Sequence, residues 1–206
     1  MRLTVFNTPI ISPLLKVLAR LCLLISGWKV EGKQPRIPRY ILVAAPHTSQ
    51  WDFFIGLAVA LSHGIEAHWL GKSTLFRGPL DPVMRWLGGI PVDRDRCCSL
   101  VDQSICCFKG NKQLGLVICP EDTLSKSDRW RTGFYHIARG AEVPIILAYL
   151  DFQKKKAGFG PTIKPGCSME KDLAEIQSFY DKKRGKFPDC FSPVLSSNQE
   201  KRQYFH

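Results

Sequence analysis

A histidine and an aspartate five residues apart are the first candidates for chemistry in this sequence. His47 follows an apolar run at residues 40–45 and a proline, and Asp52 opens the next apolar stretch. A carboxylate that contacts one imidazole nitrogen fixes the tautomer of the ring and favours the imidazolium formed when the other nitrogen takes a proton. The pair therefore predicts a general base. Two plainer interpretations stay open: a lone histidine is more often structural, and Asp52 also fits a capping box with Ser49 at the start of a helix.

A second block, residues 71–94, is rich in basic residues and glycine. Lys72, Arg77 and Arg94 place positive charge within it. Guanidinium groups bind phosphate oxygens bidentately, so the block predicts a site for a phosphate-bearing substrate, with a solvated basic loop as the alternative. Gly71 and Gly78 indicate tight backbone turns beside a bulky group.

A third block, residues 120–126, follows the strongest apolar run of the chain. It begins with Pro120 and Glu121. A carboxylate at this point would face the same site as His47 if the preceding run is a strand, although an ordinary strand-end carboxylate would look the same.

These blocks need elements that bring them together, and the apolar runs predict an α/β fold. Short apolar runs indicate buried strands at residues 40–45, 67–70, 89–92, 114–119 and 143–150. Helices are predicted at residues 53–61, 97–112, 132–139 and 169–183. Strands that alternate with helices predict a mostly parallel central sheet flanked by helices. In such sheets the loops at the carboxyl ends of the strands build the site.

An apolar stripe at helical spacing precedes the predicted sheet. Its members are Leu14, Val17, Leu18, Leu21, Leu24, Ile25 and Trp28. Lys16 and Arg20 lie off the stripe, so the helix either packs on the core or lies in a membrane interface with Trp28 at its rim. No uncharged apolar stretch reaches the roughly 18 residues of a spanning helix. Charges inside the segment also disfavour a signal peptide.

The composition is that of a folded domain with a strong basic surplus. The chain has 206 residues, with 45% apolar and 23% charged residues, which excludes a disordered or polytopic membrane protein. The net charge of +11 favours anionic partners. Two basic runs, residues 154–156 and 182–186, are either solvated faces or binding surfaces. We divide the chain into a membrane-associating segment at 1–35, an α/β domain at 36–190 and a polar tail at 191–206.

The eight cysteines predict reduced thiols in a cytosolic compartment. Four of them form the adjacent pairs Cys97–Cys98 and Cys106–Cys107, and no C-x-x-C occurs. Zinc sites and secreted disulfide scaffolds have different spacing. Cys119 lies inside an apolar run with nothing to lower the pKa of its thiol, which disfavours a cysteine hydrolase.

Four blocks in order resemble the motifs of the glycerophospholipid acyltransferase superfamily, of the lysophosphatidate acyltransferase type. His47 and Asp52 match its H-x4-D block. The residues that match the second, third and fourth blocks are Lys72, Leu75, Phe76, Pro79, Gly89, Ile90 and Arg94; Pro120, Glu121, Thr123 and Ser125; and Val143, Pro144 and Ile145. The resemblance covers roughly residues 40 to 150. Each motif alone is weak or moderate, but their shared order and spacing are specific.

The resemblance implies an O-acyltransferase that needs no cofactor and no metal ion. It would move a fatty acyl group from acyl-CoA or acyl-carrier protein to a hydroxyl of a lysophospholipid such as 1-acyl-glycerol-3-phosphate. His47 would be the base, oriented by Asp52, with Arg94 on the acceptor phosphate and Glu121 on its polar part. The implied substrate-binding set is Lys72, Arg94, Glu121, Thr123, Ser125 and Lys126. The expected partners are a membrane lipid acceptor, the acyl donor and the membrane surface, with the protein peripheral on the cytoplasmic side.

The third block departs from the family pattern, because it reads P-E-D-T-L-S. Asp122 replaces a glycine, which the backbone tolerates since aspartate enters the left-handed region more readily than most residues. Leu124 replaces an arginine and cannot supply a guanidinium. The contact is then lost from this block unless a nearby cation, Lys126, Arg129 or Arg131, replaces the arginine. A lost charged partner costs about 1.5–3 kcal/mol. A non-catalytic or altered-acceptor lipid-binding homologue therefore stays open as the alternative function.

A nucleic-acid binder is the other alternative raised by the charge. Such proteins interleave basic and aromatic residues on one element. Here the aromatic residues lie mostly in apolar runs, so we expect no nucleic acid among the partners. The sequence carries no signal for the oligomeric state.

Overall fold

The structure is a computed structural model that describes residues 3–32, 36–93, 98–121 and 130–190. Its strands are β1 (Lys29–Glu31), β2 (Arg39–Ala45), β3 (Ala67–Lys72), β4 (Gly89–Val92), β5 (Leu114–Ile118), β6 (Ile145–Asp151) and β7 (Lys156–Ile163). Its helices are α1 (Ile11–Ile25), α2 (Trp51–His63), α3 (Leu80–Trp86), α4 (Leu100–Gly110), α5 (Gly133–Ala141) and α6 (Met169–Tyr180). Two short 3-10 turns are η1 (Ser73–Leu75) and η2 (Pro188–Cys190).

The strands form one sheet in the order β1-β7-β6-β2-β5-β3-β4. The pairings from β6 through β2, β5 and β3 to β4 are all parallel. Strand β7 runs antiparallel to β6, and β1 pairs with β7 in parallel. The predicted mostly parallel α/β sheet is thus confirmed, and the loops after β2, β5 and β3 lie at one edge of it.

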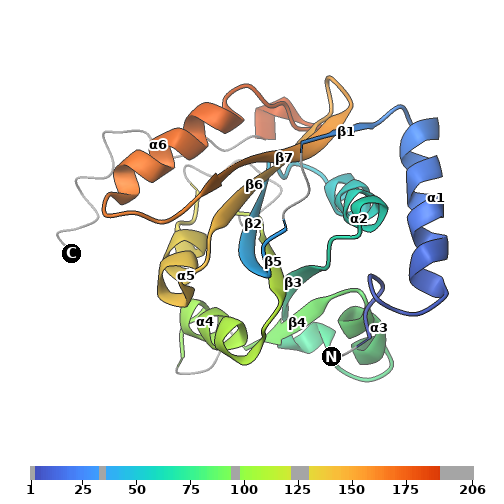
Figure 1. Cartoon of the computed structure of the whole chain (residues 1–206), viewed down its shortest axis with the longest axis horizontal. Helices are drawn as coiled ribbons and strands as arrows, with labels where there is room; N and C mark the ends of the chain where they lie inside the picture. Colours follow the sequence, from blue (N-terminus) through green and yellow to red (C-terminus); the bar gives the residue numbers. More distant parts are fainter. Residues whose placement is uncertain (1–2, 33–35, 94–97, 122–129, 191–206) are drawn as a thin grey trace.

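Helices cover both faces of this sheet (Figure 1). Helices α4, α5 and α6 bury their apolar sides against one face, which includes Ile41 and Val43 of β2. The intervening residues Tyr40 and Leu42 point to the other face, where they pack against Ala60 of α2. This alternation follows from the period of two along a strand. Helix α2, which starts beside His47, is therefore held on the sheet by its own buried side.

Helix α1 forms an outer layer on α2, with its apolar stripe facing away from the protein. Ala19 and Leu23 are buried against α2. Arg20 Nε donates to the carbonyl of Ser62 at 3.2 Å, and Lys16 is half-buried beside the end of α2. Cations are favourable at the negative, carboxyl end of a helix. The exposed members of the stripe are Leu14, Val17, Leu18, Leu21, Leu24 and Ile25, the last of them 84% exposed.

This arrangement corrects one expectation for the N-terminal segment. The interpretation of the stripe as a core-packing face is wrong, since its side chains are exposed while Lys16 and Arg20 turn toward α2. Trp28, expected at the rim of a membrane interface, is partly exposed. It lies after the helix, is half-buried and packs edge-on against Phe152, with 5.0 Å between ring centroids.

Three elements were not predicted from the sequence, and each has a physical reason. Strand β1 is too short to give an apolar pattern. Strand β7 contains two glycines and Pro161, residues that disfavour strand interiors, and the β6–β7 register shifts near that proline. Helix α3 carries Pro82 in its first turn, where proline is tolerated.

The structure can be compared with two of the predicted segments of the chain, residues 1–35 and residues 191–206. Strand β1 lies within residues 1–35 and yet is an edge strand of the sheet, so this segment contributes to the α/β domain. The predicted tail at 191–206 lies outside the described residues. No helix in the described ranges combines the length and apolar character needed to cross a membrane.

Candidate active site

His47 lies in the loop that joins β2 to α2, directly after the cis peptide bond between Ala45 and Pro46. Its Nδ1 is 3.3 Å from Oδ2 of Asp52, in the first turn of α2. The imidazole is 27% exposed, whereas the Asp52 side chain is 4% exposed. One ring nitrogen thus faces a buried carboxylate while the ring remains accessible. This is the geometry predicted for a base and its orienting partner.

Asp52 is held by the backbone of the same loop. Its Oδ2 accepts hydrogen bonds from the backbone N–H groups of Thr48 at 2.8 Å and Ser49 at 2.9 Å. Its Oδ1 is buried without a hydrogen-bond partner among the described residues. The carboxylate therefore fixes the loop around His47 as well as the ring.

The capping box predicted around Asp52 is present only in part. Asp52 does reach back to the Ser49 N–H. The Ser49 hydroxyl, however, accepts from the N–H of Trp51 at 3.2 Å, and the helix begins one residue later, with Gln50 as its N-cap. The structural and catalytic interpretations of Asp52 are thus compatible, because one oxygen contacts both the backbone and His47.

Glu121 follows β5, the strand next to β2, and also supports the His47 loop. Its Oε1 accepts the backbone N–H of His47 at 3.0 Å, and its side chain is 1% exposed. Burial is the main cause that raises the pKa of Glu121 to about 7, although the bond from His47 opposes it. Its Oε2 is buried with no partner among the described residues. The sequence predicted Glu121 as a contact to the acceptor; the structure shows it bonded to the backbone of the His47 loop.

We expect Glu121→Gln to remove part of the pH dependence of stability. Because the pKa is raised from about 4.5 to about 7 on folding, the stabilising contribution of the protonated carboxyl is complete below pH 4.5 and is lost as the pH rises through 7. Glutamine still accepts the His47 N–H but carries no charge. The difference in unfolding free energy between variant and wild type should grow by about 3 kcal/mol from pH 4.5 to pH 8. Urea titrations at both pH values measure it, and parallel curves would contradict it.

The segment after α6 contacts the same loop, which the sequence did not predict. The backbone N–H of Phe187 donates to Thr48 Oγ1 at 3.2 Å. A Cβ atom at Gly185 would lie 2.6 Å from that same hydroxyl oxygen, so only glycine fits there. Gly185 could have been noticed as the single interruption of a basic run, but sequence spacing gives no sign of its contact with Thr48.

Lys72 lies at the same edge of the sheet as His47 and Glu121. It is the exposed last residue of β3, which pairs in parallel with β5. One strand, β5, separates β3 from β2, so the two strands are roughly 10 Å apart. Lys72 and the His47 loop thus lie two strands apart at one edge of the sheet. The other predicted substrate-binding residues, Arg94, Thr123, Ser125 and Lys126, lie outside the described residues.

The glycines of the second block make room for a side chain of the protein itself. Cβ atoms at Gly71 and Gly89 would lie 2.7 Å and 2.8 Å from ring atoms of Phe76. Phe76 is buried and its ring centroid is 6.1 Å from that of Trp69. The bulky group predicted beside Gly71 is therefore Phe76. At Gly78 the tight turn is confirmed by a φ of +61°.

The alternative of a cysteine nucleophile is not supported by the environment of Cys119. Burial raises the pKa of this thiol to about 12, with Glu121 and Asp52 adding to the effect. A thiol with such a pKa stays protonated near neutral pH and is a weak nucleophile. The described residues also contain no group of three or more His, Cys, Asp or Glu side chains placed to hold a metal ion.

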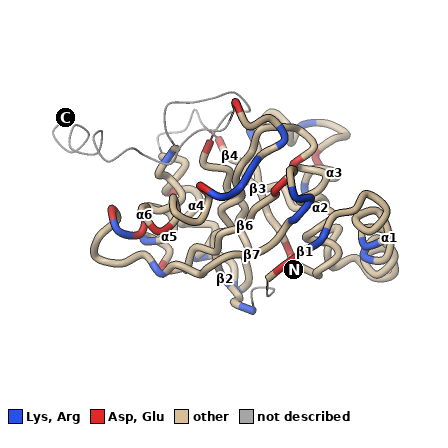
Figure 2. The backbone as a smooth tube through the Cα atoms, turned by 90° about the horizontal axis from the view of Figure 1, so that it is seen from above, with Lys and Arg blue, Asp and Glu red and all other residues tan. Residues whose placement is uncertain are grey.

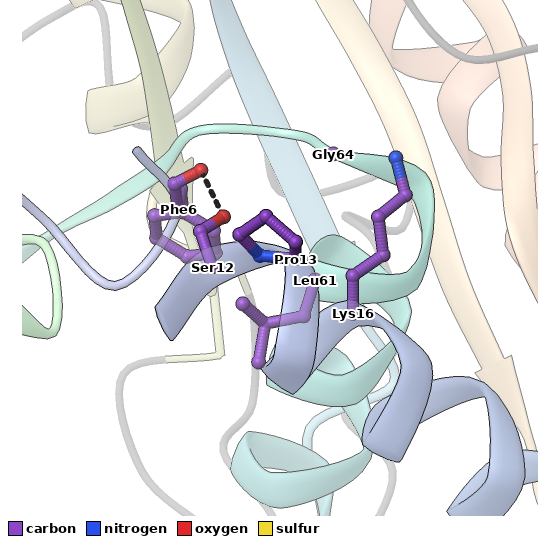
Figure 3. A pocket seen from close by; sticks show the side chains of 6 residues that line it. All are labelled: Phe6, Ser12, Pro13, Lys16, Leu61 and Gly64. Atoms are coloured by element: carbon purple, nitrogen blue, oxygen red, sulfur yellow. Dashed lines mark hydrogen bonds between the residues drawn. The ribbon is translucent and has the colours of Figure 1, made fainter. Parts of the chain in front are cut away.

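A cavity of about 330 Å³ lies apart from this site (Figure 3). It is lined by Phe6, Ser12, Pro13, Lys16, Leu61 and Gly64, between the first turns of α1 and the end of α2. The two ends of the 13-residue helix α2 are about 18 Å apart, and His47 precedes the other end. The cavity therefore belongs to the α1–α2 contact and not to the His47 site.

Comparisons with known proteins agree with this geometry. The solved structure of the 1-acyl-sn-glycerophosphate acyltransferase PlsC from Thermotoga maritima has a similar fold, with a TM-score of 0.56 and 17% sequence identity. The similarity covers 81% of this chain and 74% of that protein. A search of curated protein sequences gives no match. The sequence model of the acyltransferase family matches residues 28–150. This range is more than half of the chain and includes both His47 and Asp52, so the protein belongs to the acyltransferase family.

Proposed function

We propose that this protein transfers a fatty acyl group from acyl-CoA or acyl-carrier protein to a hydroxyl of a lysophospholipid such as 1-acyl-glycerol-3-phosphate. The observation that carries the proposal is the 3.3 Å contact between His47 Nδ1 and a buried carboxylate of Asp52. It leaves Nε2 as the nitrogen that can accept a proton. Family membership supports acyl transfer in general, and the acceptor and the donor are the part we propose.

The reaction we propose needs no covalent enzyme intermediate. Nε2 of His47 takes the proton of the acceptor hydroxyl as its oxygen attacks the thioester carbonyl carbon. The new ester bond forms, the carbon–sulfur bond breaks, and the leaving thiolate takes the proton from the His47 imidazolium, which returns the ring to its neutral form. Asp52 stabilises the positive imidazolium in between. Such base catalysis typically contributes about 10²–10⁴-fold, and positioning supplies the remainder.

The acceptor phosphate would be held by positive charge at the carboxyl edge of the sheet. Lys72 is exposed at this edge, and Arg94 follows β4, the strand next to β3, by two residues. Glu121 would act beneath the loop by holding the His47 backbone, so its influence on the acceptor is indirect.

The second candidate is a non-catalytic or altered-acceptor lipid-binding homologue. Leu124 in place of the family's arginine is the observation that favours it. The intact contact between His47 and Asp52 opposes it, because a protein that only binds lipid has no need for an oriented base.

A lipid-product assay tests the proposal. Purified protein is incubated with mixed lysophospholipids and with either acyl-CoA or acyl-carrier protein, and the products are identified by mass spectrometry. We expect a diacyl product whose formation requires His47. A protein that binds these lipids but forms no ester with either donor would be the non-catalytic homologue.

We also propose that the protein works as a peripheral protein on the cytoplasmic side of a membrane. The exposed stripe of α1 supports this, because a run of large apolar side chains on the outside of a protein marks an interaction surface. A helix of this kind lies in the membrane interface and does not span the bilayer. Trp51 and Phe54 add exposed rings at the start of α2, beside the catalytic loop.

A further inference from the structure

The two basic runs of the sequence lie next to each other in the folded protein. The backbone N–H of Phe152, which precedes the first run, donates to the carbonyl of Arg184 in the second at 2.9 Å. Figure 2 shows, in blue, where lysine and arginine residues lie along the backbone. We define the basic ridge as the exposed side chains of Lys154, Lys182, Arg184 and Lys186.

Acidic residues in the same two segments offset only part of this charge. Residues 151–156 and 181–189 together contain seven basic and three acidic residues. Asp151 accepts the backbone N–H of Lys154, and Glu31 of β1 pairs with Lys156 at the sheet edge. Asp181 and Asp189 are exposed at the two ends of the second segment. The ridge therefore keeps a positive surplus that faces solvent.

The ridge lies next to the His47 loop. Its residue Lys186 contacts two exposed aromatic residues there. Lys186 Nζ is 5.1 Å from the ring centroid of Trp51 and 5.8 Å from that of Phe187. Trp51 and Phe187 are 58% and 51% exposed. Trp51 precedes Asp52, and Phe187 is bonded to Thr48 of the His47 loop. A ligand that binds the ridge would thus lie beside the His47 loop.

The first basic run also contacts the end of helix α1 through Lys155, the neighbour of Lys154. Lys155 Nζ donates to the carbonyl of Ser26, the C-cap of α1, at 3.1 Å. The edge-on contact of Trp28 with Phe152 fixes the turn that carries Lys154 against the same helix end. Leu24 and Ile25, the most exposed members of the last turn of α1, lie there. The end of the apolar stripe, the basic ridge and the exposed aromatic rings are therefore linked through contacts between adjoining segments.

From this continuity we infer that the basic ridge binds the anionic headgroups of the membrane on which α1 docks. The inference rests on the proposed function, since it names the kind of lipid surface that this acyltransferase uses. Basic side chains next to a membrane-inserted apolar face add attraction to anionic lipids, and aromatic rings prefer the headgroup level. An acidic carrier protein would also match the charge. It would leave the adjoining exposed apolar side chains unexplained, so the membrane surface accounts for more of the structure.

Vesicle binding by the full-length protein tests the inference. Vesicles of phosphatidylcholine alone are compared with vesicles of phosphatidylcholine and phosphatidylglycerol in equal amounts. The ridge variant carries Lys154→Gln, Lys182→Gln and Lys186→Gln. The matched control removes the same charge from exposed lysines near α4 and α6, on the face of the sheet opposite α1 (Figure 1), with Lys109→Gln, Lys112→Gln and Lys171→Gln.

We expect the ridge variant to bind the anionic vesicles roughly tenfold or more weakly than wild type, and the neutral vesicles equally well. The control should bind both as wild type does. Added salt should weaken wild-type binding to the anionic vesicles only. By contrast, Leu18→Asp with Leu21→Asp should weaken binding to both kinds, because it removes the apolar contribution of α1.

Two results would overturn the inference. One is an equal loss in the ridge variant and the control, which would indicate net charge alone. The other is a ridge variant that binds both kinds of vesicle as wild type does but uses acylated acyl-carrier protein more slowly. This result would identify the ridge as a binding surface for the acyl donor. Vesicle binding is measured without turnover. If the wild-type protein forms no ester but binds the vesicles as expected, the proposed function is refuted, whereas binding of the ridge to anionic membranes is still supported.

Discussion

His47→Ala should lower the turnover of acyl donor and lysophospholipid by about 10²–10⁴-fold. Alanine leaves no group at this position that can take the proton of the acceptor hydroxyl, while the loop that places the substrate is unchanged. Residual turnover then reflects positioning and electrostatics alone. The measurement is kcat and KM with the lipid product quantified by mass spectrometry, and we expect the loss mainly in kcat.

The fold should survive this substitution. The His47 ring is partly exposed, and the bonds that hold the loop come from the backbone of residues 47–49 to Glu121 and Asp52. We expect the unfolding free energy to change by less than about 1 kcal/mol, as is usual for partly exposed sites. Full activity in a folded His47→Ala protein would exclude this residue as the base.

The sheet was predictable from the sequence because its strands are buried on both faces. Residues 40–45, 114–119 and 143–150 are continuous apolar runs, and they became the neighbouring strands β2, β5 and β6. Once these strands are parallel, their carboxyl ends share an edge. The approach of Glu121 to His47 across 74 residues of sequence then follows from topology alone.

The orientation of α1 was not predictable, since its apolar stripe has the same spacing whether it faces a core or a membrane. In the structure Ala19 and Leu23 are the side chains buried against α2, and Arg20 donates to the carbonyl of Ser62 near the end of α2. The contact of Gly185 with Thr48 depends on where the chain returns after α6. Such contacts between distant segments leave no periodicity in the sequence.

The contact between His47 and Asp52 leads to the second large effect, which we expect from Asp52→Asn. The amide oxygen can still accept the backbone N–H groups of Thr48 and Ser49, as Oδ2 does now. The negative charge that stabilises the imidazolium is lost, however. We expect kcat to fall by roughly 10²-fold or more, since a correctly placed base without its carboxylate is a poor one. The measurement is the same lipid-product assay at saturating acceptor.

Asp52→Ala separates this catalytic role from the structural one. It removes the same charge but also leaves the two backbone N–H groups buried and unpaired, which costs about 1–3 kcal/mol for each group. Alanine should therefore lower both kcat and the unfolding free energy, whereas asparagine should lower kcat with a much smaller loss of stability. If the asparagine variant kept wild-type kcat while alanine unfolded the loop, Asp52 would serve only to hold the backbone. The 3.3 Å approach of its carboxylate to the imidazole would then carry no chemistry.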